Sequence, residues 1–187
     1  KMISQIMEGE KEYLATLCLG IETSTQDPEG EVTVTKPVGS LSVAVVEACL
    51  EKFRGEQLQV PPIYSALKHK GKPLYHYARK GIAIEKPPRS VIIHTLERTG
   101  NGIELNDSFP YLTIRVVCSK GTYIRTLAQD IGRVLGCGAS LTALRRVRSG
   151  CFHVRDSVDG KCLSDADAKE RLMDKVLSLT DVRNLLQ

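Results

Sequence analysis

Strand-like and helix-like segments follow one another irregularly along the chain, and their order constrains the fold most. Strand patterns occupy residues 13–19, 91–97, 112–117 and 151–154. Helical spacing occupies residues 42–53, 74–80, 123–135 and 140–146. Ser42 is placed to cap the first of these helices, and the third is expected to bury Ile124, Leu127, Ala128, Ile131 and Val134. The loops are short, and the strands are not separated by regular crossover helices. We therefore predict an α+β fold, with a mixed or largely antiparallel sheet and packed helices, rather than a doubly wound sheet.

The 187 residues divide by composition near Arg155. Residues 156–187 hold seven acids, and Ser164 and Asp167 are spaced to cap a helix that runs through Leu177. Residues 2–7 have the pattern of the tail of an element that begins upstream. We predict a main domain over residues 1–155, incomplete at its N-terminal end, and a helical acidic extension over residues 156–187.

Composition excludes several classes of protein. Hydrophobic residues make up 42% of the chain, yet no apolar run approaches the ~20 residues of a membrane span, and the first residues given do not have the pattern of a signal peptide. The six cysteines form no C-x-x-C pair, so we expect reduced, buried thiols rather than a metal site or a disulfide framework. No glycine-rich phosphate loop follows a strand, so we expect no nucleotide cofactor. We expect the protein to be a cytoplasmic monomer that binds no metal.

Positive charge gathers in two blocks, although the net charge is only +4. Residues 118–150 hold six basic residues against Asp130, and residues 64–80 hold five with three tyrosines and no acid. A solvated surface would explain one such block, but two with interleaved tyrosines favour a nucleic acid partner. The candidate RNA contacts are Tyr64, Lys68, Lys70, Lys72, Tyr75, Arg79, Lys120, Arg145, Arg146 and Arg148.

The stretch CSKGTYIRT at residues 118–126 places cations where a helix begins. The start of a helix is already positive, so Lys120 and Arg125 predict an anion beside it. A carboxylate or phosphate bound by both arms of the Arg125 guanidinium would offset the unfavourable dipole. Tyr123 faces a different direction from Arg125, and simple packing remains an open reading for it.

Three motifs together resemble the TruB family of tRNA pseudouridine synthases. They are KEYLATLCLGIETSTQDPEG at residues 11–30, IYSALKHKGKPLYHYARKG at residues 63–81, and CSKGTYIRTLAQDIGRVLGCGA followed by LTALRRVRSG at residues 118–150. The resemblance implies a pseudouridine synthase fold and the isomerisation of uridine 55 in the T-loop of tRNA, without metal or cofactor. It also implies that tRNA is the partner.

The resemblance assigns roles to four residues. Tyr13 corresponds to the tyrosine that stacks on the target base, and Tyr123 to a tyrosine beside the sugar and base. Arg125 corresponds to the arginine that pairs with the catalytic aspartate, and Leu144 to a leucine that contacts the substrate. The flipped base needs an aromatic face and an anion partner in one cleft, so we expect these four to converge. Lys120 is expected to bind RNA phosphate. We also expect residues 64–80 to form one basic surface with Arg145, Arg146 and Arg148, flanking this cleft.

One family motif is missing from the chain. The catalytic aspartate lies in a glycine-rich motif of the form HTGALDPLATG, and nothing similar occurs here. Asp27 belongs to a different loop of the family, and Asp130 is expected on a helix surface, beside Arg133 or in solvent. We therefore predict an inactive fragment of the enzyme, without the RNA-binding C-terminal domain, in which Arg125 is unpaired or holds a solvent anion. The alternatives are a non-catalytic module of the same fold that binds and folds tRNA, and an ordinary α+β protein with basic surface patches.

Overall fold

The computed structural model describes residues 5, 6, 8–84, 86–100 and 109–186, and the predicted element over residues 2–7 lies largely outside them. In chain order the strands are β1 Lys11–Leu19, β2 Ile21–Thr23, β3 Val32–Thr35, β4 Gly55–Gln59, β5 Lys68–His69, β6 Lys72–Pro73, β7 Arg89–Arg98, β8 Tyr111–Cys118, β9 Ala139–Ser149 and β10 Phe152–His153. The helices are α2 Val43–Glu51, α3 Leu74–Ala78, α4 Ile124–Val134, α5 Ala168–Asp174 and α6 Leu179–Leu185, with short 3-10 turns at Val154–Asp156 and Gly160–Ser164.

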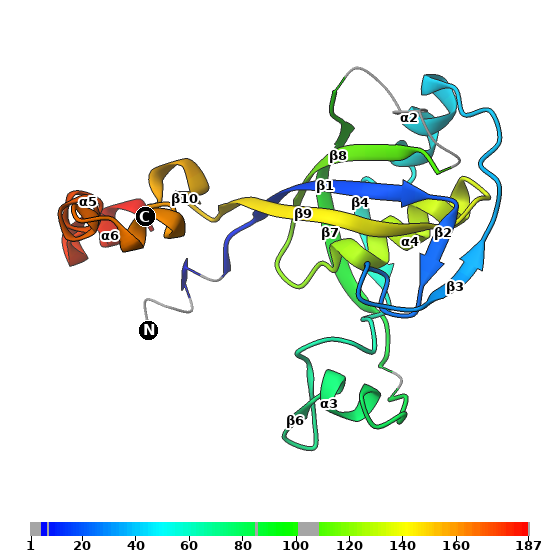
Figure 1. Ribbon diagram of the computed structural model, residues 1–187, viewed down its shortest axis with the longest axis horizontal. Coiled ribbons are helices and arrows are strands. Elements are labelled where there is room, and N and C mark those ends of the chain that lie inside the picture. Colours follow the sequence, from blue (N-terminus) through cyan, green and yellow to red (C-terminus); the bar gives the residue numbers. More distant parts are fainter. Residues whose placement is uncertain (1–4, 7, 85, 101–108, 187) are drawn as a thin grey trace.

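Six strands form one antiparallel sheet in the order β10-β9-β1-β8-β7-β4 (Figure 1). This sheet confirms the predicted α+β fold. The helix expected over residues 140–146 is wrong, because these residues belong to β9, which pairs with the whole length of β1. Two register shifts interrupt this ladder, so the apolar residues of β9 do not alternate strictly. Leu141 and Leu144, three residues apart, therefore imitated helical spacing.

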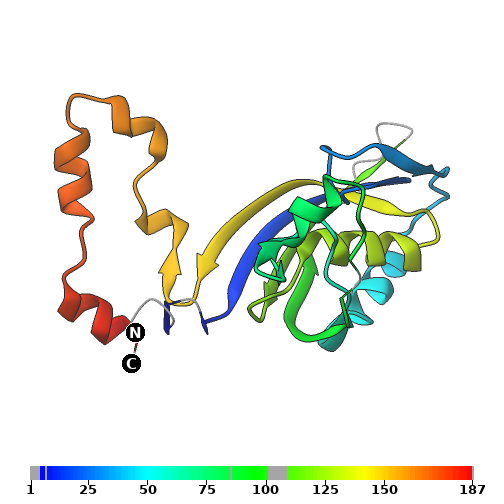
Figure 2. The same ribbon diagram turned by 90° about the horizontal axis from the view of Figure 1, so that it is seen from below.

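The hydrophobic core lies between one side of the curved sheet and the helices α2 and α4 (Figure 2). Ile124, Leu127, Ala128 and Ile131 of α4 are buried there, as their spacing predicts. Val134 was expected beside them but is 48% exposed, because it lies at the end of the helix. At the start of α2 the predicted cap is confirmed, since the Val45 amide donates to Ser42 Oγ at 3.3 Å.

A small lobe of β5, β6 and α3 projects from the sheet (Figure 1). Lys70 and Gly71 both have positive φ, at 48° and 80°, which suits the two-residue turn that joins β5 to β6. α3 covers most of the helix predicted over residues 74–80. The lobe therefore presents much of the basic block of residues 64–80 outside the main body.

Residues 154–186 form an arm that extends away from the sheet (Figures 1 and 2). None of these residues is buried. The predicted cap of the helix in this segment is wrong: Asp167 stands at the N-cap position of α5 without a side-chain cap bond, and the helix ends at Asp174. A second helix, α6, follows and begins with a capping box formed by Ser178 and Asp181.

Candidate functional site

The start of α4 lies at the centre of the candidate site. β8 ends at Cys118, Gly121 turns the chain with a φ of 83°, and Tyr123 stands at the N-cap position of α4. Tyr123 and Arg125 leave this first turn in different directions, so they serve two neighbouring hollows. The smaller hollow holds Arg125 and the larger holds Tyr123.

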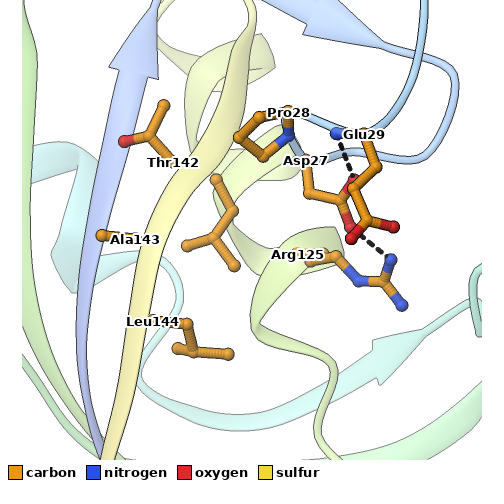
Figure 3. Close-up of a pocket in the computed structure, with 8 residues that line it drawn as sticks. Asp27, Pro28, Glu29, Arg125, Thr142, Ala143 and Leu144 are labelled. Carbon is orange, nitrogen blue, oxygen red and sulfur yellow. Dashed lines mark hydrogen bonds and ion pairs between the residues drawn. The ribbon is translucent and has the colours of Figure 1, made fainter.

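Arg125 is paired with Asp27 of the loop between β2 and β3 (Figure 3). Its Nη1 donates to Asp27 Oδ2 at 2.6 Å and to the Thr25 carbonyl at 3.3 Å, and its Nη2 donates to the Tyr64 carbonyl at 2.7 Å. The prediction that Arg125 would be unpaired or hold a solvent anion is therefore wrong. The sequence pointed to an anion beside the helix start, and Asp27 supplies it from within the chain.

The Asp27 carboxylate is held on both of its oxygens. Oδ1 accepts from the Thr25 hydroxyl and from the Glu29 amide at 3.1 Å, while Oδ2 accepts from Arg125. Partial burial on its own would raise the pKa of Asp27, but the bonds from Thr25, Arg125 and the Glu29 amide, with the charge of Arg125, outweigh it and lower the pKa. Asp27 is thus a fixed anion whose two oxygens accept three hydrogen bonds.

Gln26 holds the loop that carries Asp27 against two other elements. Its backbone has a φ of 66°, a conformation that non-glycine residues adopt rarely and at some energetic cost. Its side-chain amide binds Thr126 at 3.1 Å and Gln129 at 2.8 Å, and its carbonyl accepts from the Leu141 amide of β9 at 3.0 Å. These three bonds offset the strain and fix Asp27 relative to α4.

The same side of α4 carries a second ion pair. Arg133 donates to both carboxylate oxygens of Glu22, at 3.1 Å and 2.8 Å, and Gln129 donates to Glu22 at 2.9 Å. Asp130 was expected on the helix surface, but it is half-buried, and burial raises its pKa. Arg133 hydrogen-bonds the carboxylate of Glu22, while its charge partly offsets the effect of burial on the pKa of Asp130.

The four residues expected to converge divide between the two hollows. Asp27, Arg125 and Leu144 line a hollow of about 310 Å³, and Figure 3 shows Leu144 on the strand that faces the ion pair. Tyr13 and Tyr123 line the neighbouring hollow of about 660 Å³. Because Tyr123 and Arg125 belong to one turn, the two hollows flank the same helix start.

The larger hollow is rimmed by positive charge. Lys11, Arg89, Lys120 and Arg146 line it, against Glu8 as the one acid among its lining residues. Lys120, predicted to bind phosphate, lies 3.3 Å from Glu8, and both side chains are well exposed. An exposed pair of this kind is worth little, so an RNA phosphate can replace Glu8 as the partner of Lys120.

The three arginines of β9 do not share one side of the sheet. Tyr13 pairs with Arg146, whereas Leu14 pairs with Arg145 and Glu12 with Arg148. Directly paired residues of antiparallel strands lie on the same face, so Arg146 faces the hollow and the other two face away from it. Arg148 binds Glu12 at 3.2 Å and Glu10 at 3.1 Å. The expectation of one basic surface formed with all three arginines is therefore wrong.

The predicted RNA contacts in the basic block of residues 64–80 lie on the lobe and at its base. The Tyr64 carbonyl holds Arg125, and Leu67 lines the larger hollow, so the base of the lobe reaches the site. Lys68, Lys70 and Lys72 follow the hairpin of β5 and β6. The Arg79 guanidinium lies 5.4 Å from the ring centre of Tyr75, which is 41% exposed.

No cluster of three or more His, Cys, Asp or Glu that could hold a metal ion occurs among the described residues. Of the helices in the described ranges, none is long and apolar enough to cross a membrane.

Sequence reasoning missed Asp27 as a partner of Arg125, and it missed Gln26 and Gln59. The amide of Tyr123 donates to Gln59 Oε1 at 2.7 Å, and Gln59 Nε2 donates to the Tyr123 carbonyl at 3.1 Å. The one signal in the sequence for Gln59 was its place as a polar residue two positions before Pro61 and Pro62. Nothing in the spacing of Gln26 or Asp27 indicated contact with a helix about a hundred residues away.

Comparison with known proteins supports the family resemblance along the whole chain. The family model described as TruB family pseudouridylate synthase (N terminal domain) matches residues 1–124. A second, described as tRNA pseudouridylate synthase B C-terminal domain, matches residues 125–183.

Relatives named tRNA pseudouridine synthase B are similar to the chain. That of Desulfotalea psychrophila is 58% identical over 187 residues, which cover 100% of this chain and 76% of the relative. That of Francisella philomiragia is 47% identical over 173 residues, covering 92% of this chain and 55% of the relative. The chain thus spans about half to three quarters of these relatives.

A solved structure shares the fold. The crystal structure of a Cbf5-Nop10-Gar1 complex contains a chain that matches with a TM-score of 0.61 and 22% identity, covering 98% of this chain and 46% of that one. This match supports the antiparallel sheet with its packed helices. With a family model over most of the chain and a relative at 58% identity, this protein belongs to the TruB family of pseudouridylate synthases.

Proposed function

We propose that the protein containing this chain converts uridine 55 in the T-loop of tRNA to pseudouridine. The observation that carries the proposal is the larger hollow, which Tyr13 and Tyr123 line together with four cations, Lys11, Arg89, Lys120 and Arg146. Aromatic side chains give a flipped base a stacking surface, and the cations suit the phosphates on either side of it. The names of the relatives, tRNA pseudouridine synthase B, support tRNA as the substrate.

The reaction is an isomerisation and needs no oxidant. The bond between the sugar carbon and the base nitrogen breaks, the base turns, and a base carbon joins the sugar, while one proton leaves that carbon and the nitrogen gains one. In this proposal Tyr13 supports the base, Tyr123 lies beside the sugar and takes part in removing the proton, and Leu144 limits the movement of the base. Arg125 orders the carboxylates at the helix start.

The sugar becomes cationic as the bond breaks and needs a carboxylate beside it. Asp27 is unsuited to this role, because its two oxygens already accept three hydrogen bonds within the chain, from the Thr25 hydroxyl, the Glu29 amide and Arg125. We therefore propose that the nucleophile comes from a segment with the glycine-rich aspartate motif, and that the 187-residue chain alone forms no pseudouridine.

The test measures tritium release from T-loop RNA labelled in uracil. We expect no turnover by the 187-residue chain, turnover when a relative's segment with the aspartate motif is joined to it, and none when that aspartate is changed to alanine. Turnover by the chain alone would contradict the assignment of the nucleophile. Tight RNA binding without turnover by the joined protein would favour the non-catalytic tRNA-folding module instead.

Three further properties belong to this proposal. We propose a protein that works as a monomer, without a metal, in the cytoplasm. The described cysteines support a reducing compartment, because Cys18, Cys49, Cys118 and Cys137 are buried free thiols. Burial raises the pKa of the Cys118 thiol to about 11, so this group remains an unreactive thiol at neutral pH.

A further inference from the structure

We propose that Gln59 is a positioning residue that sets the first turn of α4 and, through it, the directions of Tyr123 and Arg125. The proposal rests on the proposed function, since the two side chains that Gln59 would position are ones to which that function gives roles. Gln59 is the last residue of β4, and only 6% of it is exposed.

The side-chain amide of Gln59 binds the backbone of Tyr123 on both sides. Its Oε1 accepts from the Tyr123 amide at 2.7 Å, and its Nε2 donates to the Tyr123 carbonyl at 3.1 Å. Tyr123 stands at the N-cap position of α4 and makes no side-chain cap bond. Backbone groups at the start of a helix lack partners within the helix, so a bond from another element decides where the helix begins.

The Tyr123 carbonyl also accepts the first hydrogen bond of the helix, from the Leu127 amide at 3.0 Å. The Tyr123 carbonyl oxygen thus accepts two hydrogen bonds, one from the Leu127 amide of the helix and one from Gln59 Nε2. Together these bonds hold Tyr123 at φ −96° and ψ 106°, an extended conformation directly before the helical turn. Rotation of either peptide around Tyr123 would redirect its ring within the hollow that Tyr13 also lines, and it would turn the following residues of the helix.

A second bond from the same segment reaches Arg125. The Tyr64 carbonyl accepts from Arg125 Nη2 at 2.7 Å, and between Gln59 and Tyr64 the prolines Pro61 and Pro62 restrict the backbone. The segment of residues 59–64 therefore holds the helix start at two points, one for each functional side chain. Asp27 holds Arg125 from the opposite loop.

The position calls for glutamine because both a donor and an acceptor are required. Leucine offers neither and would leave the Tyr123 amide unpaired near the protein interior, which costs free energy. An ionised glutamate would still accept from the Tyr123 amide, but it would place a second acceptor against the Tyr123 carbonyl. Gln57, two residues earlier on β4, donates to the carbonyls of Lys52 and Arg54 and lies outside the site, so it provides a matched control.

The activity experiment uses the full-length protein that carries these residues, with the variants Gln59→Leu, Gln59→Glu, Gln57→Leu and Gln57→Glu. Single-turnover rates on T-loop RNA and the Kd for that RNA are measured and corrected for the folded fraction of each variant. We expect both Gln59 variants to lower the rate at saturating RNA by about tenfold to a hundredfold, as small misplacements of reacting groups do, with Kd changed less than about threefold. Both Gln57 variants should match the wild type.

An independent measurement needs no activity. In the 187-residue chain, hydrogen exchange at the Tyr123 amide should be at least about tenfold faster in Gln59→Leu than in the wild type, and unchanged in Gln57→Leu. The proposal would be overturned if exchange at the Tyr123 amide were the same in Gln59→Leu as in the wild type. It would also be overturned if the Gln59 variants lost turnover only in proportion to their loss of folded protein. An inactive wild-type enzyme in which exchange still accelerates would contradict the proposed function and leave the geometry of Gln59 established.

Discussion

The carboxylate of Asp27 lies 2.6 Å from the guanidinium of Arg125, and the two residues are 98 positions apart in the chain. This pair joins the β2–β3 loop to the start of α4 and closes one wall of the smaller hollow (Figure 3). It also changes what Arg125 can do. Under the proposed function, an incoming catalytic carboxylate would meet an arginine that a fixed anion has already oriented, rather than a mobile cation.

Replacing Asp27→Asn should lower the free energy of unfolding by about 1.5–3 kcal/mol at neutral pH, the usual worth of a hydrogen bond to a charged group. The pKa of Asp27 is lowered in the folded protein, so its contribution is present above its unfolded pKa, about 3.9, and is lost as the pH falls through the folded pKa. Urea unfolding from pH 7 to pH 3 should show the two proteins converging at acid pH. Glu29→Gln, in the same loop but exposed, is the control, and a constant difference across this range would contradict the prediction.

Replacing Asp130→Asn should raise the free energy of unfolding at neutral pH, the opposite of the effect expected at Asp27. Burial raises the pKa of this half-buried carboxyl, so its ionisation opposes folding at neutral pH. The folded protein holds the proton more tightly than the unfolded chain, and stability therefore falls as the pH rises between the two pKa values. We expect the variant to be more stable than the wild type at pH 7 and equal to it at pH 3. A loss of stability at pH 7 would show that Asp130 is favourably paired.

Arg146 and Arg145 offer a matched pair for RNA binding, because they are neighbours in sequence on opposite faces of β9. Arg146→Ala should weaken T-loop RNA binding and reduce the slope of log K against log salt by about one, since one phosphate contact is lost. Arg145→Ala should leave that slope unchanged. Fluorescence anisotropy at several salt concentrations measures both, and equal losses would mean that the RNA contacts both faces of the strand.

Gly132→Ala should destabilise the contact between α4 and β9. A Cβ at this position would lie 2.2 Å from the Ala139 amide nitrogen and 2.3 Å from the Gly138 carbonyl carbon, both of them backbone atoms. Forcing the helix from the strand should cost about 1–3 kcal/mol or more in thermal or urea unfolding. Gly160→Ala meets open space and should change stability by less than about 0.5 kcal/mol, which controls for the substitution itself.

The sequence predicted the helices α2, α3 and α4 and the strands β1, β7, β8 and β10, because caps and apolar periodicity are local, but it did not predict the short strands β2 to β6. Ser42 at the start of α2 and the buried stripe of α4 are examples. β9 was mistaken for a helix because its partner β1 imposes the strand and its register shifts hide the alternation. At the site, the motif around Tyr123 and Arg125 indicated an anion, but the identity of Asp27 depends on how a distant loop folds. Gln59 makes its hydrogen bonds to backbone atoms of Tyr123, and the pattern of side chains along a sequence does not reveal bonds of this kind.

The side chains of β9 point to two different environments. The number of residues in the strand therefore matters more than the identity of most of them. Leu144 and Arg146 lie on the side of the hollows, while Arg145 and Arg148 lie on the other side, where Arg148 binds Glu10 and Glu12. Losing or gaining one residue within the strand would exchange these two groups across the remaining ladder. Such a change would turn a leucine away from Arg125 and direct an arginine toward it, even though every residue type was still present.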